Sequence, residues 1–327
     1  MRICVVGAGA IGGLFAAKLA AAGHDVSAIA RGEQLTALQT QGLQLREPSG
    51  TAQYKLRATD KPASLGAQDV IVIALKAHQI AAMLPSLAPL LQPTTLVLPA
   101  INGLPWWYCY ADVATAARGI TRVACLDPAA DMEQRLPMAH ILGCVVHASA
   151  EVTAPGVITT NGQNKLVIGE PNHTLSERSS ALAALLTAAG FSVKHSARIR
   201  DDVWMKLVGN ASFNPIAALT QSRMDQLNAS DAIITLVRRM MEEIVAVAKA
   251  YACDPLVGID ERIAIGRSIG AVKISMHQDL ERGRPLELDA IVRAPLELGR
   301  KAGVPMPFTE SVLAMADELN KRLLLKI

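Results

Sequence analysis

Apolar residues in the first hundred positions fall into short runs separated by helical stretches. Residues 2–6, 69–75 and 95–98 are nearly continuous apolar runs of strand length, as expected for strands buried on both faces of a parallel sheet. Residues 24–30, HDVSAIA, are predicted as the next strand after an Ala-rich helical stretch that reaches Gly23. This alternation predicts an α/β domain with a doubly wound, mostly parallel sheet.

Turn signals and amphipathic patterns extend this first domain. Pro48-Ser49-Gly50 separates two strand-like runs of a hairpin, and residues 176–189 have the spacing of an amphipathic helix. The remaining strands are predicted at residues 43–46, 51–55, 120–125, 140–147, 165–168 and 191–195.

The second part of the chain has a different pattern. From about Arg198 long helical periodicity replaces the strand signals, and residues 232–252 carry apolar side chains at the spacing of a core-facing helix. A chain of 327 residues is long for a single core. We therefore predict an α/β domain at residues 1–197 and an all-α domain at residues 198–327.

One helix of the second part carries a polar stripe. The segment 204–215, WMKLVGNASFNP, is mostly apolar, but Lys206, Asn210 and Asn214 are four residues apart and therefore share one face. Pro215 predicts that the helix ends or kinks near Asn214, which could also cap a second helix. The stripe is either a solvated face or a set of groups that need a ligand, because unpaired polar groups are costly to bury.

A glycine-rich loop follows the first predicted strand. Residues 7–12 read GAGAIG, which matches the dinucleotide-binding pattern of strand, GxGxxG and helix. Gly7 permits the tight turn, Gly9 lets a pyrophosphate approach the backbone, and Gly12 lets the helix pack close to the strand. The helix then offers its first N–H groups, around Ala10 and Ile11, to the phosphates.

The residue at the end of the second strand bears on the choice of cofactor. An NAD-binding protein usually has an acidic residue there, but this chain has Arg31, with Glu33 nearby. A cation at this position suits the 2′-phosphate of NADP(H), so the sequence favours NADP(H) as the cofactor. Alternatively, Arg31 is an ordinary surface arginine without a role in binding.

Lys76 and Asn102 each follow a predicted parallel strand. Ligands of open α/β sheets bind at the carboxyl ends of the strands, so we expect both side chains at the edge that carries the glycine loop and Arg31. Singly, Lys76 could be a solvated strand end, and Asn102 could be a turn residue before Gly103.

A second polar group lies in the helical part. Ser275 and Asp279 are four residues apart, and Glu287 follows a Gly-Arg-Pro break. Glu287 and Asp289 point to different sides of the next helix, so at most one should face a cleft shared with Lys206. Alternatively, both acids belong to a solvated first turn.

Charge and composition exclude several classes of partner. The formal net charge of +3 and the absence of like-charge blocks argue against nucleic acid or an anionic membrane surface. No apolar run is long enough to span a bilayer. The apolar helical domain is compatible with a homodimer.

The cysteines indicate a reducing compartment. Five are present, and no two have CxxC spacing, which is typical of free thiols and argues against a disulfide scaffold or a metal site. The apolar N-terminus is interrupted by glycines and lacks a cleavage site, so it is not a signal peptide. We expect a cytoplasmic protein.

Taken together, the motifs resemble the ketopantoate reductase (2-dehydropantoate 2-reductase) family. The resemblance rests on the glycine loop, Asn102-Gly103, the W-x-K-x3-N-x3-N-P pattern of residues 204–215, the S-M-x-Q-D pattern of residues 275–279, and the segment around Glu287. It implies a Rossmann domain that binds NADPH and a helical domain that closes the active site. The implied reaction is the reduction of ketopantoate to pantoate in pantothenate biosynthesis.

The resemblance also implies roles for individual residues. Lys206 matches the lysine that protonates the ketone oxygen, and Glu287 the carboxylate that holds the substrate hydroxyl. The groups that position the substrate are Asn210, Asn214, Ser275 and Asn102. The residues that match cofactor contacts are Gly7, Gly9, Ala10, Ile11, Gly12, Arg31, Lys76 and Asn102.

Several residues depart from the family pattern. Ile101 replaces a common glutamine, Ile274 replaces Thr, Ser or Pro, and Trp106-Trp107 forms an unusual pair. Two alternatives therefore accompany ketopantoate reduction: an NADPH-dependent reductase of another branched 2-keto or 3-hydroxy acid, and a non-catalytic NADPH sensor. Retention of Lys206 and Glu287 argues against the sensor, which needs no proton donor.

Overall fold

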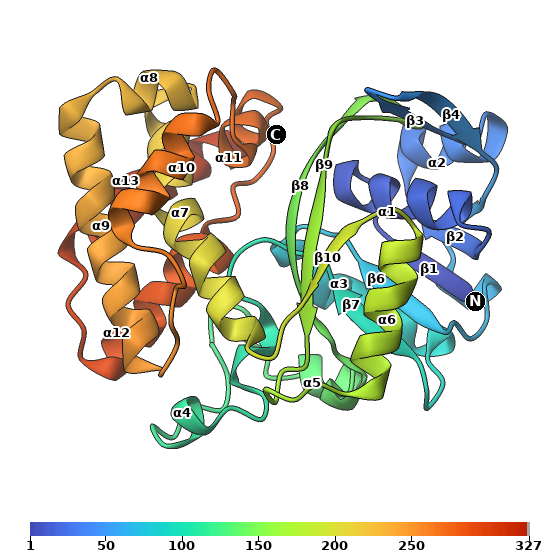
Figure 1. Ribbon diagram of the computed structural model, residues 1–327, viewed down its shortest axis with the longest axis horizontal. Coiled ribbons are helices and arrows are strands. Elements are labelled where there is room, and N and C mark those ends of the chain that lie inside the picture. The colour runs from blue at the N-terminus through green and yellow to red at the C-terminus, as the bar shows by residue number, and fades with distance from the viewer. Residues whose placement is uncertain (326–327) are drawn as a thin grey trace. The chain divides into compact units, whose positions relative to one another are not determined.

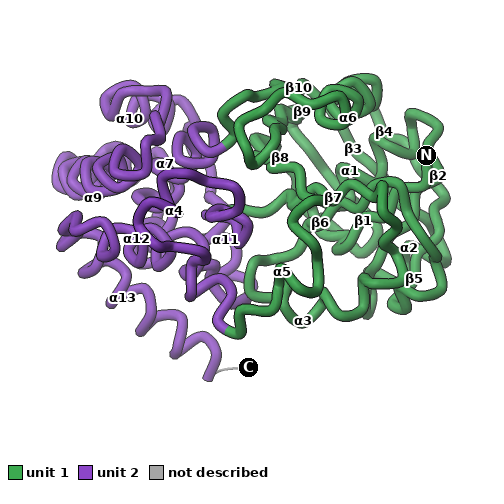
Figure 2. The backbone as a smooth tube through the Cα atoms, turned by 90° about the horizontal axis from the view of Figure 1, so that it is seen from below, with its two compact units in different colours: residues 1–102, 129–199 green, residues 103–128, 200–327 purple. Residues whose placement is uncertain are grey.

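The chain forms two compact units, shown in different colours in Figure 2. The computed structural model describes residues 1–325. Unit 1 comprises residues 1–102 and 129–199, and unit 2 comprises residues 103–128 together with the chain from Arg200 onward. The sequence indicated one boundary near residue 198, but the chain passes between the units three times, after Asn102, Pro128 and Ile199.

Unit 1 contains a five-stranded sheet in the order β5-β2-β1-β6-β7, in which all neighbouring strands are parallel. Strand β6 is apolar and buried along its whole length, and β1 is apolar and buried from Ile3 to Val6, as expected for strands covered on both faces. The predicted doubly wound sheet is confirmed. The strands are β1 (Arg2–Val6), β2 (Asp25–Ile29), β5 (Arg57–Thr59), β6 (Val70–Ile73) and β7 (Leu96–Pro99).

A second sheet of unit 1 has the order β10-β9-β3-β4, and β8 pairs with β9. The hairpin at Pro48-Ser49-Gly50 is present as the antiparallel pair β3 and β4. Strands β8 and β9 form a much longer antiparallel hairpin. The strands are β3 (Leu43–Glu47), β4 (Gly50–Tyr54), β8 (Gly143–Ala154), β9 (Val157–Gly169) and β10 (Ser192–His195).

Helix α1 (Ala10–Ala21) is buried in the core shared by the two sheets of unit 1 (Figure 1). An added Cβ at Gly12 would overlap the carbonyl oxygen of Gly7, and one at Gly13 would lie 2.5 Å from Ile158 of the second sheet. Small residues thus let the helix approach both sheets. The other helices of unit 1 are α2 (Gly32–Thr40), α3 (Ala77–Leu87), α5 (Met132–Arg135) and α6 (Glu177–Ala188), with short 3-10 turns at Pro62–Ser64, Ala88–Leu90 and Met138–His140.

Unit 2 is helical, as predicted for the second half of the chain. Its amphipathic helix α9 (Asp231–Ala250) buries a face that includes Val237, Met240 and Ile244. None of the described helices combines the length and apolarity needed to cross a bilayer. The other helices are α4 (Val113–Ala116), α7 (Ile199–Thr220), α8 (Met224–Asn228), α10 (Ile259–Ser268), α11 (Ser275–Glu281), α12 (Ala294–Ala302) and α13 (Pro307–Leu324), with a 3-10 turn at Trp106–Cys109 and a π-helical turn at Asp289–Arg293.

The strand predicted at residues 120–125 was wrong. This segment is irregular and belongs to unit 2. The backbone N–H groups of Ala124 and Cys125 donate to the two carboxylate oxygens of Glu297, at 2.8 and 2.9 Å. A carboxylate from α12 therefore satisfies the backbone groups that a neighbouring strand would otherwise bind.

The helix predicted at residues 204–215 also differs from expectation. It is part of α7, which continues through Pro215 to Thr220, so Asn214 does not cap a second helix. Phe213, Ile216 and Ala217 are buried on both sides of the proline. Packing of this apolar surface keeps the chain helical although Pro215 contributes no N–H.

We predict that Glu297→Ala lowers the thermal stability of unit 2. The Glu297 side chain is only 18% exposed, and its loss leaves two backbone N–H groups without their acceptor, at a cost of about 1–3 kcal/mol. Thermal unfolding followed by circular dichroism measures the change. The matched control is Glu310→Ala, which breaks an exposed pair with Arg300 and should cost at most about 1 kcal/mol. Equal losses in both variants would contradict this explanation.

The same comparison depends on pH. Burial opposes ionisation of Glu297, but hydrogen bonds from the Ala124 and Cys125 amides and from Lys301 outweigh it and lower the pKa of the carboxyl group. A lowered pKa in the folded state adds stability above the unfolded-state value of about 4.3, and this stability is lost as the pH falls through the folded-state pKa. The gap between parent and Glu297→Ala should therefore narrow below about pH 4.

Candidate functional site

The glycine loop of unit 1 has the geometry of a dinucleotide cradle. Gly7 has φ +94°, and an added Cβ there would lie 2.7 Å from Leu75. Gly9 has nothing within 4 Å of the place a Cβ would take. The first and third glycines are thus fixed by close packing, whereas the second presents an open backbone surface where a pyrophosphate can approach.

The first turn of α1 supplies hydrogen-bond donors beside this surface. Gly9 precedes the helix, and the bond from the Gly13 N–H to the Gly9 carbonyl, 2.7 Å long, opens its hydrogen-bond ladder. The N–H groups of Ala10 and Ile11 come before that bond and have no acceptor within the helix. Such a turn is a ready anion site, so these residues fit the phosphates of a dinucleotide.

Three further predicted residues lie at the carboxyl ends of strands in the same sheet. Arg31 follows β2 and is exposed at the start of α2. Lys76 follows β6, where its N–H donates to Gln79 at 3.3 Å, and Asn102 follows β7. Because β2, β1, β6 and β7 are adjacent and parallel, the structure gathers these residues at the edge that carries the glycine loop.

The other predicted residues lie in unit 2. Lys206 and Asn210 are half-buried on α7, and Asn214, one turn further on, is only 4% exposed. The predicted stripe is therefore not a solvated face. Ser275 is half-buried at the first position of α11, and Glu287 is 5% exposed.

Glu287 and Asp289 have different environments, as their spacing predicts. Glu287 is buried, whereas Asp289 is exposed and pairs with Arg293 at 2.8 Å. The Glu287 carbonyl accepts from the Ile291 N–H at 3.2 Å, where a π-helical turn begins. Such turns occur often at functional sites. Of the two acids, Glu287 is the one that lies in a buried environment.

Gly103 is required where the chain enters unit 2. Its φ is +84°, and an added Cβ would lie 2.5 Å from the backbone of Ala290. The next N–H, of Leu104, donates to the Ala290 carbonyl at 2.7 Å. The turn after Asn102 therefore packs directly on the π-helical turn that follows Glu287.

Sequence analysis missed a buried cation at the start of α7. Arg200 is 0% exposed and donates to the carbonyls of Tyr108 and Tyr110, at 2.9 and 2.6 Å. The Asp112 carboxylate lies 3.6 Å away. Burial lowers the pKa of Arg200, and Asp112 opposes this effect. In the sequence Arg200 stands beside Asp201 and Asp202, which is typical of an ordinary charged first turn of a helix.

Trp204, one turn after Arg200, also binds the segment that contains Tyr108. Its Nε1–H donates to the Tyr108 hydroxyl at 2.8 Å, and the two rings meet edge to face. The segment 103–128 is thereby attached to the same helix that carries Lys206, within unit 2.

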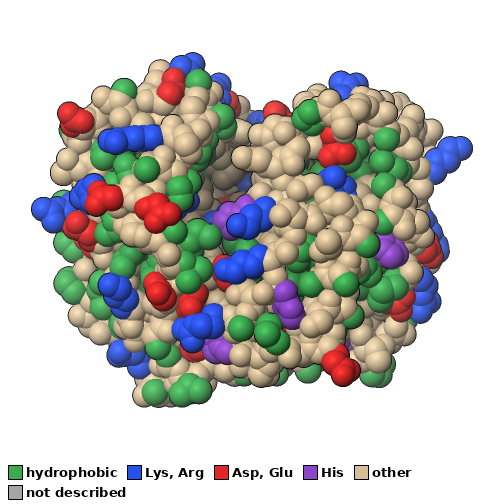
Figure 3. Space-filling model, in the orientation of Figure 1, with side chains coloured by type: hydrophobic (Ala, Val, Ile, Leu, Met, Phe, Trp, Pro, Cys, Tyr) green, Lys and Arg blue, Asp and Glu red, His purple; other side chains and the backbone are tan. Residues whose placement is uncertain are grey.

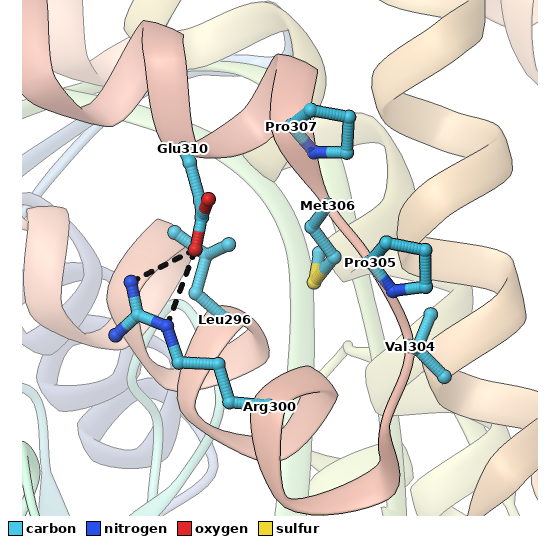
Figure 4. Close-up of a pocket in the computed structure, with 7 residues that line it drawn as sticks. All are labelled: Leu296, Arg300, Val304, Pro305, Met306, Pro307 and Glu310. Carbon is cyan, nitrogen blue, oxygen red and sulfur yellow. Dashed lines mark hydrogen bonds and ion pairs between the residues drawn. The ribbon is translucent and has the colours of Figure 1, made fainter.

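A surface pocket elsewhere in unit 2 contains none of the predicted residues. Figure 4 shows it between the end of α12 and the start of α13, where Arg300 pairs with Glu310. Its volume is about 230 Å³. On the face shown in Figure 3, basic and acidic side chains are interspersed, and no continuous basic surface is seen.

The fold and the glycine loop define a dinucleotide-binding protein of the Rossmann class. Residues 3–173 match the family model "Ketopantoate reductase PanE/ApbA", and residues 198–320 match "Ketopantoate reductase PanE/ApbA C terminal". The chain belongs to the ketopantoate reductase family.

Individual relatives extend over nearly the whole chain. A 2-dehydropantoate 2-reductase of Mesorhizobium japonicum is 42% identical, with 98% of each chain covered. A crystal structure of a candidate ketopantoate reductase from Ralstonia solanacearum is 36% identical, with a TM-score of 0.93 and 98% of each chain covered. The ternary structure of D-mandelate dehydrogenase with NADH and anilino(oxo)acetate shares the fold at 23% identity, with a TM-score of 0.85 and 99% of each chain covered.

We predict that Gly9→Ala weakens dinucleotide binding with little effect on stability, whereas Gly12→Ala lowers the stability of the fold. Gly9 has an ordinary backbone conformation, φ −76° and ψ −160°, with open space around it, so alanine should change stability by at most about 1 kcal/mol. Its methyl group would occupy the open surface that a dinucleotide pyrophosphate can approach, so the Kd for a nicotinamide dinucleotide should rise about tenfold or more. Fluorescence titration and thermal unfolding measure the two effects.

Gly12→Ala is the matched comparison. Its Cβ would overlap the Gly7 carbonyl, which forces α1 away from β1 and should cost about 1–3 kcal/mol of stability. An unchanged Kd in folded Gly9→Ala would rule out a pyrophosphate at this backbone surface.

Proposed function

We propose that this protein reduces 2-dehydropantoate to pantoate with NADPH. The observation that carries the proposal is the half-buried Lys206, on one stripe with Asn210 and the buried Asn214. The family and the 42% identical 2-dehydropantoate 2-reductase support the same substrate. Pantothenate biosynthesis is the corresponding pathway.

The residues of the stripe, together with Ser275 and Glu287, each have a role in this chemistry. The nicotinamide supplies the hydride when it is bound. As the keto carbon accepts it, negative charge develops on the ketone oxygen, and Lys206 donates a proton to that oxygen. Asn210, Asn214 and Ser275 provide uncharged hydrogen bonds that orient the substrate. Glu287 accepts a hydrogen bond from the substrate hydroxyl and stabilises the ammonium of Lys206.

We further propose NADP(H) as the cofactor, in preference to NAD(H). Arg31 is exposed immediately after β2, the place where an NAD-binding protein usually has an acidic residue for the ribose hydroxyls. A guanidinium forms paired hydrogen bonds with a phosphate, and at this position it would face the 2′-phosphate. Lys76 and Asn102, at neighbouring strand ends, would contact the nicotinamide and its ribose.

A second candidate keeps the chemistry and changes the substrate to another branched 2-keto acid. Ile101, Trp106 and Trp107 are all buried, and they are departures from the family pattern that lie directly after β7. Bulky side chains at this place would alter which side chain of a keto acid fits.

The cellular compartment and oligomeric state are separate proposals. All five cysteines are free thiols, which suits the reducing cytoplasm. A homodimer is compatible with the apolar character of the helical unit.

Steady-state oxidation of NADPH with ketopantoate, beside a panel of other 2-keto acids, tests the function. Rapid turnover with a micromolar to millimolar KM is expected of ketopantoate. A better substrate within the panel would favour the second candidate, and no turnover with any keto acid would refute both.

We predict that Lys206→Ala lowers kcat by about 10²–10⁴-fold, with little change in the Kd for NADPH. The reason is that Lys206 acts on the charge that develops at the ketone oxygen. Stopped-flow single turnovers and fluorescence titration separate the two quantities. Lys249→Ala, on α9, is the control. Normal turnover in Lys206→Ala would remove this residue from the mechanism.

We predict that Arg31→Ala weakens NADPH binding while leaving NADH binding nearly unchanged. Loss of a charge-assisted contact should raise the Kd for NADPH about tenfold or more. Arg46→Ala removes an exposed arginine from β3 and should change neither Kd. If the parent binds NADH and NADPH equally, Arg31 does not select the cofactor.

A further inference from the structure

A second arginine in unit 2 lies against the helix that carries Lys206. Arg262 of α10 is half-buried, and an added Cβ at Gly209 of α7 would overlap its guanidinium. One turn further on, the ring of Phe213 lies 3.0 Å from the place of a Cβ on Gly266. The two helices, labelled α7 and α10 in Figure 1, therefore meet at matched positions. The guanidinium of Arg262 lies over Gly209.

Gly209 is the residue that makes this placement possible. It stands in the middle of a 22-residue helix, where glycine is less favourable than alanine by about 1 kcal/mol. Its φ is not positive, so the backbone does not require glycine. The requirement is steric, because any side chain would displace the guanidinium from α7.

The guanidinium of Arg262 has no counterion among residues 1–325. Its Nε is buried without a hydrogen-bond partner, and none of the described carboxylates forms an ion pair with it. Asp260, its neighbour on α10, pairs with Arg238 instead. Burial alone lowers the pKa of Arg262, with no charged group opposing it.

Arg200 shows how the same unit treats a structural arginine. Arg200 is matched by Asp112 and by two backbone carbonyls, as a buried cation requires. Arg262 has no such set. A half-buried cation without a protein partner is best explained by a partner that binds from outside the chain.

Helix geometry places Arg262 beside the polar stripe. With about 100° per residue, Lys206 lies about 60° and Asn210 about 100° around the helix from Gly209, both on the same side. Along the axis they are displaced by only about 4.5 and 1.5 Å. The guanidinium over Gly209 therefore flanks the groups assigned to the substrate.

We infer that Arg262 binds the carboxylate of the 2-keto acid while Lys206 acts on its ketone oxygen. The carboxylate of such an acid is bonded directly to the keto carbon, so the two cations must lie close together on one surface. A guanidinium presents paired N–H donors that match a carboxylate. This inference rests on the proposed function and adds the group that selects acids over neutral ketones.

The test compares an acid with its neutral counterpart in the parent and in Arg262→Gln. For the keto acid, KM should rise about 30-fold or more, as expected when one partner of a desolvated charge pair is removed. For the lactone or methyl ester of the same keto acid, which has no free carboxylate, kcat/KM should stay within about threefold. Arg262→Lys keeps the charge but not the paired donors, and it should recover part of the loss.

Arg267→Gln is the matched control. It removes the same charge from an exposed position of the same helix, so it reports on long-range electrostatics alone and should leave KM unchanged. Equal losses for acid and ester in Arg262→Gln would show a purely structural role and overturn the inference, as would an unchanged KM for the acid.

A binding measurement separates this inference from the proposed function. Calorimetric titration of 2-hydroxy acids into the parent with NADP+ needs no turnover, and Arg262→Gln should bind them about 30-fold or more weakly. If the parent binds these acids but reduces no keto acid, the proposed function fails and the carboxylate site stands. If parent and variant bind them equally, the carboxylate site fails whatever the turnover.

Discussion

The cost of removing charged and polar groups from water governs how unit 2 is built. Arg200 enters the core only with Asp112 and two tyrosine carbonyls around it. Glu297 is half-buried because two backbone N–H groups and Lys301 surround its carboxylate. The stripe on α7 obeys the same constraint, since a lysine and two asparagines in the mostly apolar segment 204–215 are costly to bury without partners. Arg200 and Glu297 are thus matched within unit 2, whereas the guanidinium of Arg262 has no counterion among residues 1–325.

Unit 1 depends on the close approach of helix α1 to the two sheets that flank it. Helix α1 lies between two sheets because Gly12 meets the Gly7 carbonyl, directly after β1, and Gly13 meets Ile158 of β9. The same short stretch begins with the open surface at Gly9. The glycines therefore serve packing on the sides that touch protein and leave space on the side proposed for the cofactor. The loop is held in shape by the core beneath it, so its N–H groups need little rearrangement on binding.

Local geometry decides how much of this could be predicted from sequence. The four-residue spacing of Lys206, Asn210 and Asn214 places them on one face in any helix, and the glycine loop is defined within six residues. The errors came from distant partners. The irregular segment at residues 120–125 depends on Glu297, 173 positions from Ala124. Continuation of α7 past Pro215 depends on packing, which overrides the local preference. The roles of Arg200 and Arg262 could not be predicted, because they depend on residues that are distant in the sequence and surround each guanidinium.

The interleaving of the two units has a consequence for the chain as it is made. Residues 103–128 are synthesised before residues 129–199, yet their fixed partners, Arg200 and Glu297, come only afterwards. During synthesis, residues 103–128 therefore emerge before these partners, while the remaining strands and helices of unit 1 are still being made. A fragment that begins at Arg200 would contain this arginine without its partners Tyr108, Tyr110 and Asp112. Replacing residues 200–327 alone with the helical domain of another protein would therefore break unit 2, although most of this unit is continuous in sequence.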